Sequence, residues 1–487
     1  MRIRVSLLAC GLILTACPFM AGQSASSLSP EVRQFVKVDA PVIALTHVKL
    51  IDGTGAPARS DQTVVIAEDK IQAVGDAATA SVPPNAKVLD LHGYSVIPGL
   101  VMMHEHLFYA AGLPRNPDGS PAQPIMIQEV GFSFPRLYLA AGVTSMRTTG
   151  SVEPYADLNI KNLIDTGKMP GPKIDVTGPY LEGPHSFFTQ MHQLTGPEDA
   201  RKLVDFWADQ GVTSFKAYMN ITRAELGAAI EEAHRRHIKV TGHLCSVTQT
   251  EAAELGIDDL EHGPMFVDTE FVPGKKLDQC PSGKAAFDSL LKQDVDGPAV
   301  QKMMRTLIDR HVAVTSTLPV FELDVPGRPP LRKQMLDSML PQAEINYLQA
   351  RATRPSPEIA TLFRKELQFE HDFVKAGGLL LAGCDPTGMG GVLAGFGDQR
   401  EIELLVEAGF SPEQAIHIAT ANGAGYEGQS QRIGTLEAGK QADLVLIHGD
   451  PSANINDIEK VDTVFKDGVG YDSQKLIESV RGTVGLY

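Results

Sequence analysis

Cysteine is scarce in this sequence: there are five in 487 residues, and Cys10 and Cys17 fall within the first 27. The remaining three, Cys245, Cys280 and Cys384, are odd in number and too few for a scaffold built on disulfides. Cys245 could pair with Cys280 in an oxidising compartment, but the sequence does not decide this. With 43% apolar residues, the chain has enough hydrophobic material for an ordinary core.

Basic residues are outnumbered, with 43 Lys and Arg against 59 Asp and Glu, and the net charge is −16. An acidic surface of this size argues against nucleic acid or another polyanion as a partner. There is no GxGxxG motif after the first central strand and no Walker loop, so nucleotide-binding folds lose their main support. No apolar run reaches the length of about 20 residues that a transmembrane helix needs.

The first 27 residues are typical of an export signal. Arg2 and Arg4 form a basic start, and residues 7–14 are an apolar run that is too short to span a bilayer. Residues 14–17 (Leu-Thr-Ala-Cys) resemble a bacterial lipobox, in which Cys17 would carry a lipid anchor. The alternative is an ordinary signal cleaved nearer Ser24. Either way, we expect a soluble body that is exported, periplasmic or secreted.

The rest of the chain shows two patterns. Residues 41–96 and 431–487 contain short strands of alternating Val, Ile and Leu with turn residues between them, which predicts two small β segments that bracket the chain. Residues 97–430 alternate apolar strands with helices, as in a parallel α/β sheet. Eight strands are expected, at 96–103, 142–147, 173–177, 212–217, 238–243, 257–261, 312–316 and 378–384. They predict a (β/α)8 TIM barrel, with a doubly wound open sheet as the alternative.

Local signals place helix starts and loops within this region. Capping boxes are expected at Thr195 with Glu198, Thr222 with Glu225, and Ser411 with Gln414. Long loops are expected at 107–135, 263–300 and 317–355, where they would form the walls of a substrate site. The first loop holds Phe108, Tyr109, Phe132 and Phe134. These aromatic residues suit an apolar substrate group or simple packing under the loop equally well.

Two histidines, His104 and His106, end the first barrel strand and are separated by one residue. On an extended chain, residues i and i+2 point to the same side, so both imidazoles can reach one metal ion. Such a pair is a weak signal by itself, because it also occurs by chance in loops. Its place at the C-terminal end of a strand, where barrel enzymes keep their sites, strengthens it.

Four further strands end in an ionisable side chain. These are Lys216 on the fourth strand, His243 on the fifth, His262 on the sixth and Asp385 on the eighth. Any one of them could be a core residue with a satisfied hydrogen bond. Together with the histidine pair, they would require five independent coincidences at one face of the barrel, so the set predicts a metal site.

These residues resemble those of the amidohydrolase superfamily, and the chain is similar to its imidazolonepropionase-like and prolidase-like members. The Pro98-Gly99 segment leading to His104-x-His106 carries the likeness, as does the closing stretch 434–444 with its Gly-Thr-Leu and Gly-Lys-Gln-Ala-Asp-Leu motifs. The resemblance implies a composite β-sandwich domain built from the flanks 41–96 and 431–487, and two divalent metal ions. By this resemblance, His104, His106 and Asp385 would hold the more buried ion and His243 and His262 the second, with Lys216, carboxylated on its Nζ atom by CO2, bridging the two.

The chemistry of such a site is consistent with these residue types. A neutral lysine between apolar neighbours can react with CO2, and the carbamate is an anionic ligand that two metals can share. A hydroxide bridging two divalent ions is nucleophilic at neutral pH. Asp385 would accept its proton and return it to the leaving nitrogen. Imidazole and oxygen ligands suit Zn2+, although manganese, iron or cobalt would also be admitted.

Two further residues are candidates for stabilising the oxyanion. His185 lies in the loop after the third strand, and Tyr218 faces the same way as Lys216. A surface histidine and a packed tyrosine are the alternatives. Arg147 or Arg223 could bind a substrate carboxylate, although an arginine near a barrel mouth more often forms a structural ion pair.

These features predict an enzyme, an amidohydrolase that cleaves a C–N bond in a dipeptide or N-acyl amino acid by attack of the bridging hydroxide. A cyclic amide, imide or lactone is the alternative substrate. A deaminase is disfavoured by Lys216, and a metal-binding protein without catalysis is disfavoured by Asp385. We also expect a small-molecule substrate, no nucleic-acid partner and a homo-oligomer.

Overall fold

The structure is a computed structural model, and it describes residues 27–109, 116, 122, 124–186, 188–329, 332–353, 356–387 and 391–485. The predicted signal sequence and the lipobox at Cys17 lie outside the described residues. No helix within these ranges combines the length and the apolar character needed to cross a membrane.

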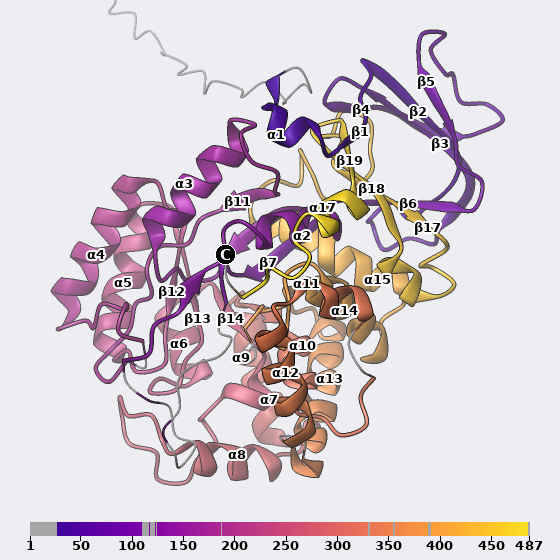
Figure 1. Ribbon diagram of the computed structural model, residues 1–487. Helices are drawn as coiled ribbons and strands as arrows, with labels where there is room; N and C mark the ends of the chain where they lie inside the picture. Colours follow the sequence, from indigo (N-terminus) through magenta and orange to yellow (C-terminus); the bar gives the residue numbers. More distant parts are fainter. Residues whose placement is uncertain are drawn as a thin grey trace, which may run out of the picture.

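Eight parallel strands form the central part of the molecule (Figure 1). They are β7 (Leu100–Glu105), β10 (Val143–Thr148), β11 (Lys173–Asp175), β12 (Ser214–Ala217), β13 (Lys239–Gly242), β14 (Asp259–Glu261), β15 (Ala313–Ser316) and β16 (Leu380–Ala382). Each overlaps one of the eight strands expected from the sequence. β11, β10 and β7 form one sheet, and β12 to β16 form a second in chain order. Parallel bridges Thr177–Ser214 and Leu181–Ala217 connect the two. The fold is therefore α/β and TIM-barrel-like, although no ladder closes around all eight strands in the described residues.

Helices follow the strands and cover the outside of the barrel (Figure 1). The longer ones are α3 (Pro154–Asp165), α4 (Pro197–Gln210), α5 (Arg223–Arg235), α9 (Pro298–Asp309), α13 (Pro357–Lys375) and α14 (Phe396–Glu407), with the shorter α2 (Phe134–Ala140), α6 (Gln249–Leu255) and α15 (Pro412–His417). The capping boxes at Thr222 and Ser411 are confirmed. The one expected at Thr195 is wrong: Gly196 caps α4, and the Thr195 hydroxyl instead donates to Asp199 at 3.0 Å.

The connections expected to be long loops are partly regular. The connection after β14 contains α7 (Pro264–Val267) and α8 (Gly283–Leu291), and the one after β15 contains α10 (Leu318–Glu322), α11 (Lys333–Ser338) and α12 (Pro341–Thr353). The connection after β7 forms the small hairpin of β8 (Phe108–Tyr109) and β9 (Gln128–Glu129), with most of its intervening residues outside the described ranges.

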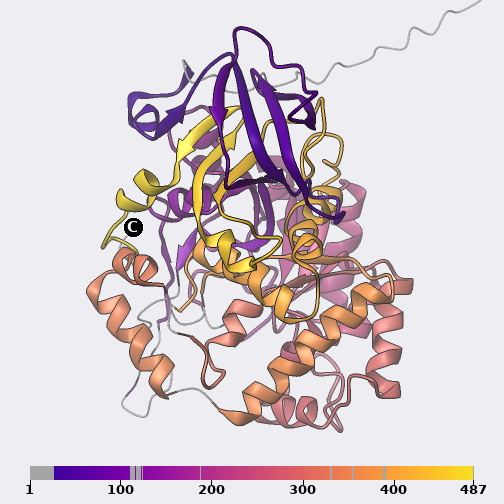
Figure 2. The same ribbon diagram turned by 90° about the vertical axis from the view of Figure 1, so that its right-hand side faces the viewer.

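Both flanks of the chain join in one sheet beside the barrel. Its strands are β1 (Val36–Val38), β2 (Val42–Leu50), β3 (Arg59–Ala67), β4 (Lys70–Asp76), β5 (Lys87–Asp90), β6 (Tyr94–Pro98), β17 (Leu444–His448), β18 (Val461–Lys466) and β19 (Val469–Asp472). Figure 2 shows the indigo N-terminal strands beside the yellow C-terminal ones, and β6 pairs directly with β17. The strand pairings give a single nine-stranded sheet, so the expected two-sheet sandwich is not confirmed.

Partly buried ion pairs connect this sheet to the barrel. The Lys173 Nζ atom, on β11, lies 2.9 Å from an Asp443 carboxylate oxygen and 2.6 Å from one of Asp467. Lys466 donates a hydrogen bond to the Gly171 carbonyl across the same boundary at 2.8 Å. Asp443, the acid of the closing sequence motif, therefore has a structural role at this boundary.

Candidate metal centre

The C-terminal ends of five barrel strands converge on one buried cluster. It contains His104 and His106 from β7, Lys216 from β12, His243 after β13, His262 after β14 and Asp385 after β16. Five of these side chains are at most 7% exposed, and His243 is half-buried. The structure thus brings together all six residues that the sequence singled out as metal ligands.

One half of the cluster contains His104, His106 and Asp385. The Asp385 Oδ1 atom lies 3.2 Å from His106 Nε2 and 3.8 Å from His104 Nε2. One ligand atom from each of the three residues lies within 4.8 Å of the others. Two imidazoles and a carboxylate at this spacing can share a single divalent ion.

The other half adjoins it through His262. The ring centroid of His262 lies 4.4 Å from that of His243 and 4.6 Å from that of His104. The Lys216 Nζ atom is 3.2 Å from His104 Nε2, and Asp385 Oδ2 is 3.8 Å from His262 Nδ1. Asp385 therefore stands between the two groups of histidines, and the Lys216 amine lies beside His104 at the edge of the first group.

Burial sets the protonation of the cluster. Burial, with the Lys216 charge nearby, lowers the pKa of His243 to about 3, and the pKa values of His104 and His262 are also well below normal. Burial likewise lowers the pKa of Lys216. For Asp385, burial alone would raise the pKa, but the facing imidazoles outweigh it and hold the pKa well below its usual range. Neutral imidazoles beside an ionised carboxylate are the forms that bind metal ions.

Two of the cluster residues have a left-handed backbone. His262 has φ = +79° and Asp385 has φ = +49°, a region that non-glycine residues seldom adopt. Such conformations cost free energy and persist where the surrounding structure enforces them, commonly at functional sites. Here each one ends a short strand and turns its side chain toward the cluster.

Supporting residues that the sequence did not single out fix the imidazoles. The Glu261 Oε2 atom lies 2.7 Å from His104 Nδ1, and the Thr317 hydroxyl lies 2.8 Å from His262 Nδ1. Partners of this kind set the ring tautomer and leave the other nitrogen for a metal ion. Only Glu261, directly before His262, had a sequence signal, its place beside a candidate ligand at a strand end; Thr317 had none, since its contact joins residues far apart in the chain.

The two candidate oxyanion residues are placed differently. The Tyr218 ring packs edge-on against His243, with centroids 5.3 Å apart, and burial raises its pKa, so its hydroxyl remains a donor. His185 is exposed, with φ = +73°, and its backbone N–H donates to Gln193. The structure brings Tyr218 to the cluster, whereas the His185 imidazole is not among the rings that pack there.

The two arginines form structural ion pairs. The buried Arg147 lies 2.7 Å from Asp259 and 3.2 Å from Glu261, beneath the cluster. Arg223, at the start of α5, pairs with Glu251 and Asp278, each at 3.0 Å. Because both guanidinium groups already have carboxylate partners, they carry no argument for binding a substrate carboxylate.

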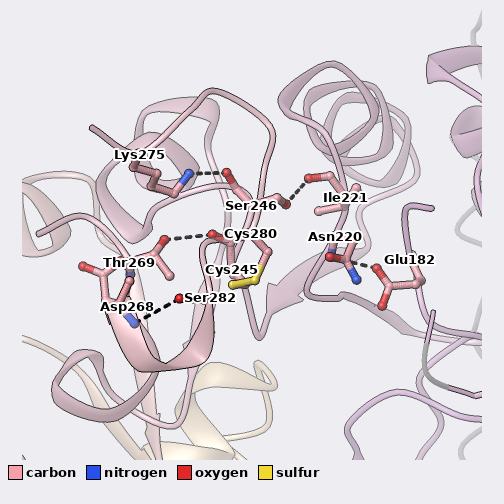
Figure 3. The surroundings of a disulfide bond; sticks show 11 residues. Glu182, Asn220, Ile221, Cys245, Ser246, Asp268, Thr269, Lys275, Cys280 and Ser282 are labelled. Atoms are coloured by element: carbon pink, nitrogen blue, oxygen red, sulfur yellow. Dashed lines mark hydrogen bonds between the residues drawn. A yellow bond between two sulfur atoms is a disulfide. The ribbon is translucent and has the colours of Figure 1, made fainter. Parts of the chain in front are cut away.

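Cys245 and Cys280 form a disulfide, which settles the question that the sequence left open (Figure 3). Cys245 lies two residues after His243, and Cys280 belongs to the connection that follows His262. The Thr269 hydroxyl also donates to the Cys245 carbonyl at 2.8 Å. The disulfide therefore ties together the two connections that leave the His243 and His262 positions.

Phe108, on β8, covers one of the candidate ligands directly. Its ring stacks on the imidazole of His106 with centroids 4.2 Å apart, and it is 4% exposed. Of the four aromatic residues in this connection, Tyr109 and Phe134 pack edge-on with each other, while Phe132 is 43% exposed on the surface. Packing under the connection thus accounts for Tyr109 and Phe134.

The donor set fits divalent metal ions. Four imidazoles and one carboxylate crowd together in the interior, and burial lowers the pKa values of His104, His243 and His262 so that their rings are neutral donors. The Asp385 carboxylate faces them in its ionised form, 3.2 Å from His106 Nε2. Neutral ring nitrogens around an ionised carboxylate are a donor set that divalent ions prefer.

Comparison with known proteins agrees with this geometry. The family model described as the amidohydrolase family matches residues 95–270 and 358–470. No curated protein matched. Among solved structures, a proposed prolidase from Bifidobacterium longum is 25% identical, with a TM-score of 0.63, covering 90% of this chain and 98% of that one.

Two other solved structures have the same fold. A Xaa-Pro dipeptidase with bound methionine has 20% identity and a TM-score of 0.64, covering 88% of this chain and 100% of that one. A bottromycin amidohydrolase has 21% identity and a TM-score of 0.65, covering 93% and 94%. The chain belongs to the amidohydrolase family, whose members are hydrolases that act on carbon–nitrogen bonds.

Proposed function

We propose that this protein is a binuclear metallohydrolase that cleaves the C–N bond of a dipeptide or N-acyl amino acid. The observation that carries the proposal is the cluster itself, in which the ligand atoms of His104, His106 and Asp385 lie within 4.8 Å of one another. His243 and His262 would hold a second ion. Zn2+ is the metal we propose, because imidazole nitrogen and carboxylate oxygen in a small coordination shell suit it.

Bound divalent ions would supply Lewis acidity, polarising the substrate carbonyl and lowering the pKa of water. Asp385 would accept the proton of the attacking water and return it to the leaving nitrogen. Its place between His106 and His262 allows this, because its two oxygens face both halves of the cluster. A lowered pKa keeps Asp385 ionised at neutral pH, which is the form that a proton acceptor requires.

Lys216 is proposed to be carboxylated on Nζ. The reaction needs a neutral amine, and burial favours that form by lowering the lysine pKa. CO2 forms a bond to the neutral amine nitrogen and one N–H proton is released, which turns a neutral amine into an anionic oxygen ligand. Its position 3.2 Å from His104 Nε2 supports a role between the two ions.

The substrate is proposed to be held from the loops above the strand ends. The Tyr218 hydroxyl would donate a hydrogen bond to the developing oxyanion, for which its protonated state is required. His185 would contact the substrate from the rim, in keeping with its exposure. A dipeptide is favoured by the likeness to the Bifidobacterium longum protein and the Xaa-Pro dipeptidase. Export, a homo-oligomer and the absence of a nucleic-acid partner remain part of the proposal.

The test is a mass-spectrometric screen of the metal-loaded protein in bicarbonate buffer against pooled dipeptides and N-acyl amino acids. An Asp385→Asn variant runs beside it, with metal content measured for both. Amino acids released by the native protein and not by the variant would support the proposal. If no amino acids are released although two metal ions are bound, cyclic amides and lactones become the substrates to test. Absence of bound metal would refute the proposed site.

A further inference from the structure

The first and last barrel strands meet without a ladder. β7 pairs with β10 and β16 pairs with β15, and no strand pairing joins β7 to β16 in the described residues. A single backbone hydrogen bond, from the Asp385 N–H to the His104 carbonyl at 3.0 Å, connects their ends. We call this junction between β7 and β16 the seam. The seam must fix the distance between the histidine pair on β7 and Asp385 after β16.

The two strand ends are in very close contact at this point. A side chain at Gly383 would place its Cβ atom 2.4 Å from His104 Cβ and 2.5 Å from the His104 backbone nitrogen. Only glycine allows that approach. The backbone before Asp385 is thus pressed against His104, and any loosening of the seam would change the positions of both ligands.

Glu105 supplies the connection that the ladder lacks. Its Oε1 atom accepts the backbone N–H of Cys384 at 3.0 Å, and its Oε2 atom accepts the Cys384 thiol at 3.1 Å. Because side chains alternate along a strand, Glu105 points away from the cluster, while His104 and His106 point into it. One carboxylate between the two histidines therefore holds the residue that directly precedes Asp385.

A second buried acid contacts the same cysteine. Asp398, on α14, accepts the Gly395 N–H at 2.7 Å, and its Oδ2 atom lies 3.5 Å from Cys384 Sγ. Glu105, Cys384 and Asp398 are all fully buried. The three side chains lie close enough together to hold a cation, but both Glu105 oxygens already accept bonds from Cys384. They act as a structural tie.

We propose that Glu105 is a positioning residue that fixes the geometry of the His104, His106 and Asp385 ligand set by tying β7 to the Cys384 backbone. This inference rests on the proposed function, since it concerns how those three residues bind a metal ion. Glu105 itself touches neither substrate nor metal. Its effect should therefore appear in metal affinity and in the geometry of the bound ion.

The test compares Glu105→Ala, Glu105→Gln and the native protein, each loaded with Co2+ after metal removal. Affinity is measured by competition with a chelator, and geometry by the visible absorption of bound Co2+. Loss of a supporting contact of this kind weakens metal binding by about 10–100-fold. We expect that loss and a changed spectrum for Glu105→Ala. Glu105→Gln should recover part of both, because its amide oxygen can still accept the Cys384 N–H.

Glu370→Ala is the matched control. Glu370 is equally buried and accepts a hydrogen bond from Ser316 on β15, a strand that carries no ligand. It should lose stability but bind Co2+ with native affinity and spectrum. If Glu105→Ala does not fold, Glu105→Gln and Cys384→Ala decide the question, since each weakens the tie more gently.

Native Co2+ affinity and spectrum in Glu105→Ala, or in both gentler variants, would overturn the inference and leave the proposed function standing. An equal loss in Glu370→Ala would also overturn it, because the effect would then be general destabilisation. A native protein that binds no Co2+ would refute the proposed function and this inference together.

Discussion

His104 Nδ1 and Glu261 Oε2 lie 2.7 Å apart, although 157 positions separate them in the chain, and both side chains are fully buried. Glu261 precedes His262, so one short strand both presents a candidate ligand and orients a ligand of another strand. Arg147, 3.2 Å from the other oxygen of Glu261, holds that carboxylate in place.

Glu261→Ala should weaken binding of the first metal ion by about 10–100-fold, because the His104 ring loses the acceptor that fixes its tautomer. Glu261→Gln should recover part of that affinity, since the amide oxygen can accept the same proton. Chelator competition measures both. Asp259→Asn is the control: Asp259 shares the Arg147 contact, whereas it is Glu261 that lies within hydrogen-bond distance of His104. Equal losses in Asp259→Asn and Glu261→Ala would show that the effect passes through Arg147.

The disulfide in Figure 3 should stabilise the fold and the second half of the site. Closing a loop across the 35 positions from Cys245 to Cys280 is worth about 4 kcal/mol of unfolding free energy in the chain-entropy view. We therefore expect Cys245→Ser/Cys280→Ser to lower the unfolding free energy by a few kcal/mol in denaturant titrations.

Relative to the native protein, the same double variant should lose more affinity for the second metal ion than for the first, because Cys245 lies two residues from His243. Reductant added to the native protein should reproduce the effect, and reductant added to the variant should change nothing further. Equal weakening of both ions would contradict the assignment of the disulfide to the His243 side.

Asp268, in the connection after β14, gives a pH-dependent prediction. Burial, with the Glu270 charge nearby, raises the pKa of Asp268 from 3.8 to about 7. Between these values the unfolded chain has released the proton and the folded chain keeps it. The free energy of unfolding should therefore fall by about 1.4 kcal/mol per pH unit through this window from this group, and the penalty should stay constant above it.

Asp268→Asn removes that dependence and can still accept the backbone N–H groups of Gln249, Thr269 and Glu270. Denaturant unfolding at pH 5, 6, 7 and 8 tests this. The stability of the variant relative to the native protein should grow from pH 5 to 7 and level off above 7. Parallel curves for the two proteins would show that Asp268 does not titrate in this range.

That these six residues gather in one place could be predicted from the sequence, because each lies at or just after the end of a short apolar strand, and the parallel strands of a barrel deliver their ends to one face. Periodicity and strand length are local, so they can be read along the chain. The same reasoning placed both β flanks in one unit, since each contains alternating strands with turns.

The supporting contacts could not be read in this way. Glu105 and Glu261 look like ordinary strand residues, and their partners Cys384 and His104 lie 279 and 157 positions away. Thr195 looked like a helix cap, but Pro197 fits the first helical position, which moves the cap to Gly196. The short helices after β14 and β15 were taken for loops because tertiary packing, more than local propensity, stabilises elements of four to thirteen residues.

Lys216 tests the bridging role most directly. Lys216→Ala removes both the amine and the carbamate that it would form, so we expect the variant to hold at most one metal ion per chain where the native protein holds two. A short carboxylate such as acetate or propionate should enter the space left by the side chain and return metal content toward two, because it supplies the same pair of anionic oxygens. Metal analysis after desalting measures both.

Lys466→Ala is the matched control: Lys466 is also buried, with a pKa lowered by burial, but lies in the β sheet. Its metal content should be native and insensitive to carboxylate. Two metals in Lys216→Ala without added carboxylate would show that histidines and Asp385 suffice, and that Lys216 is not a bridge.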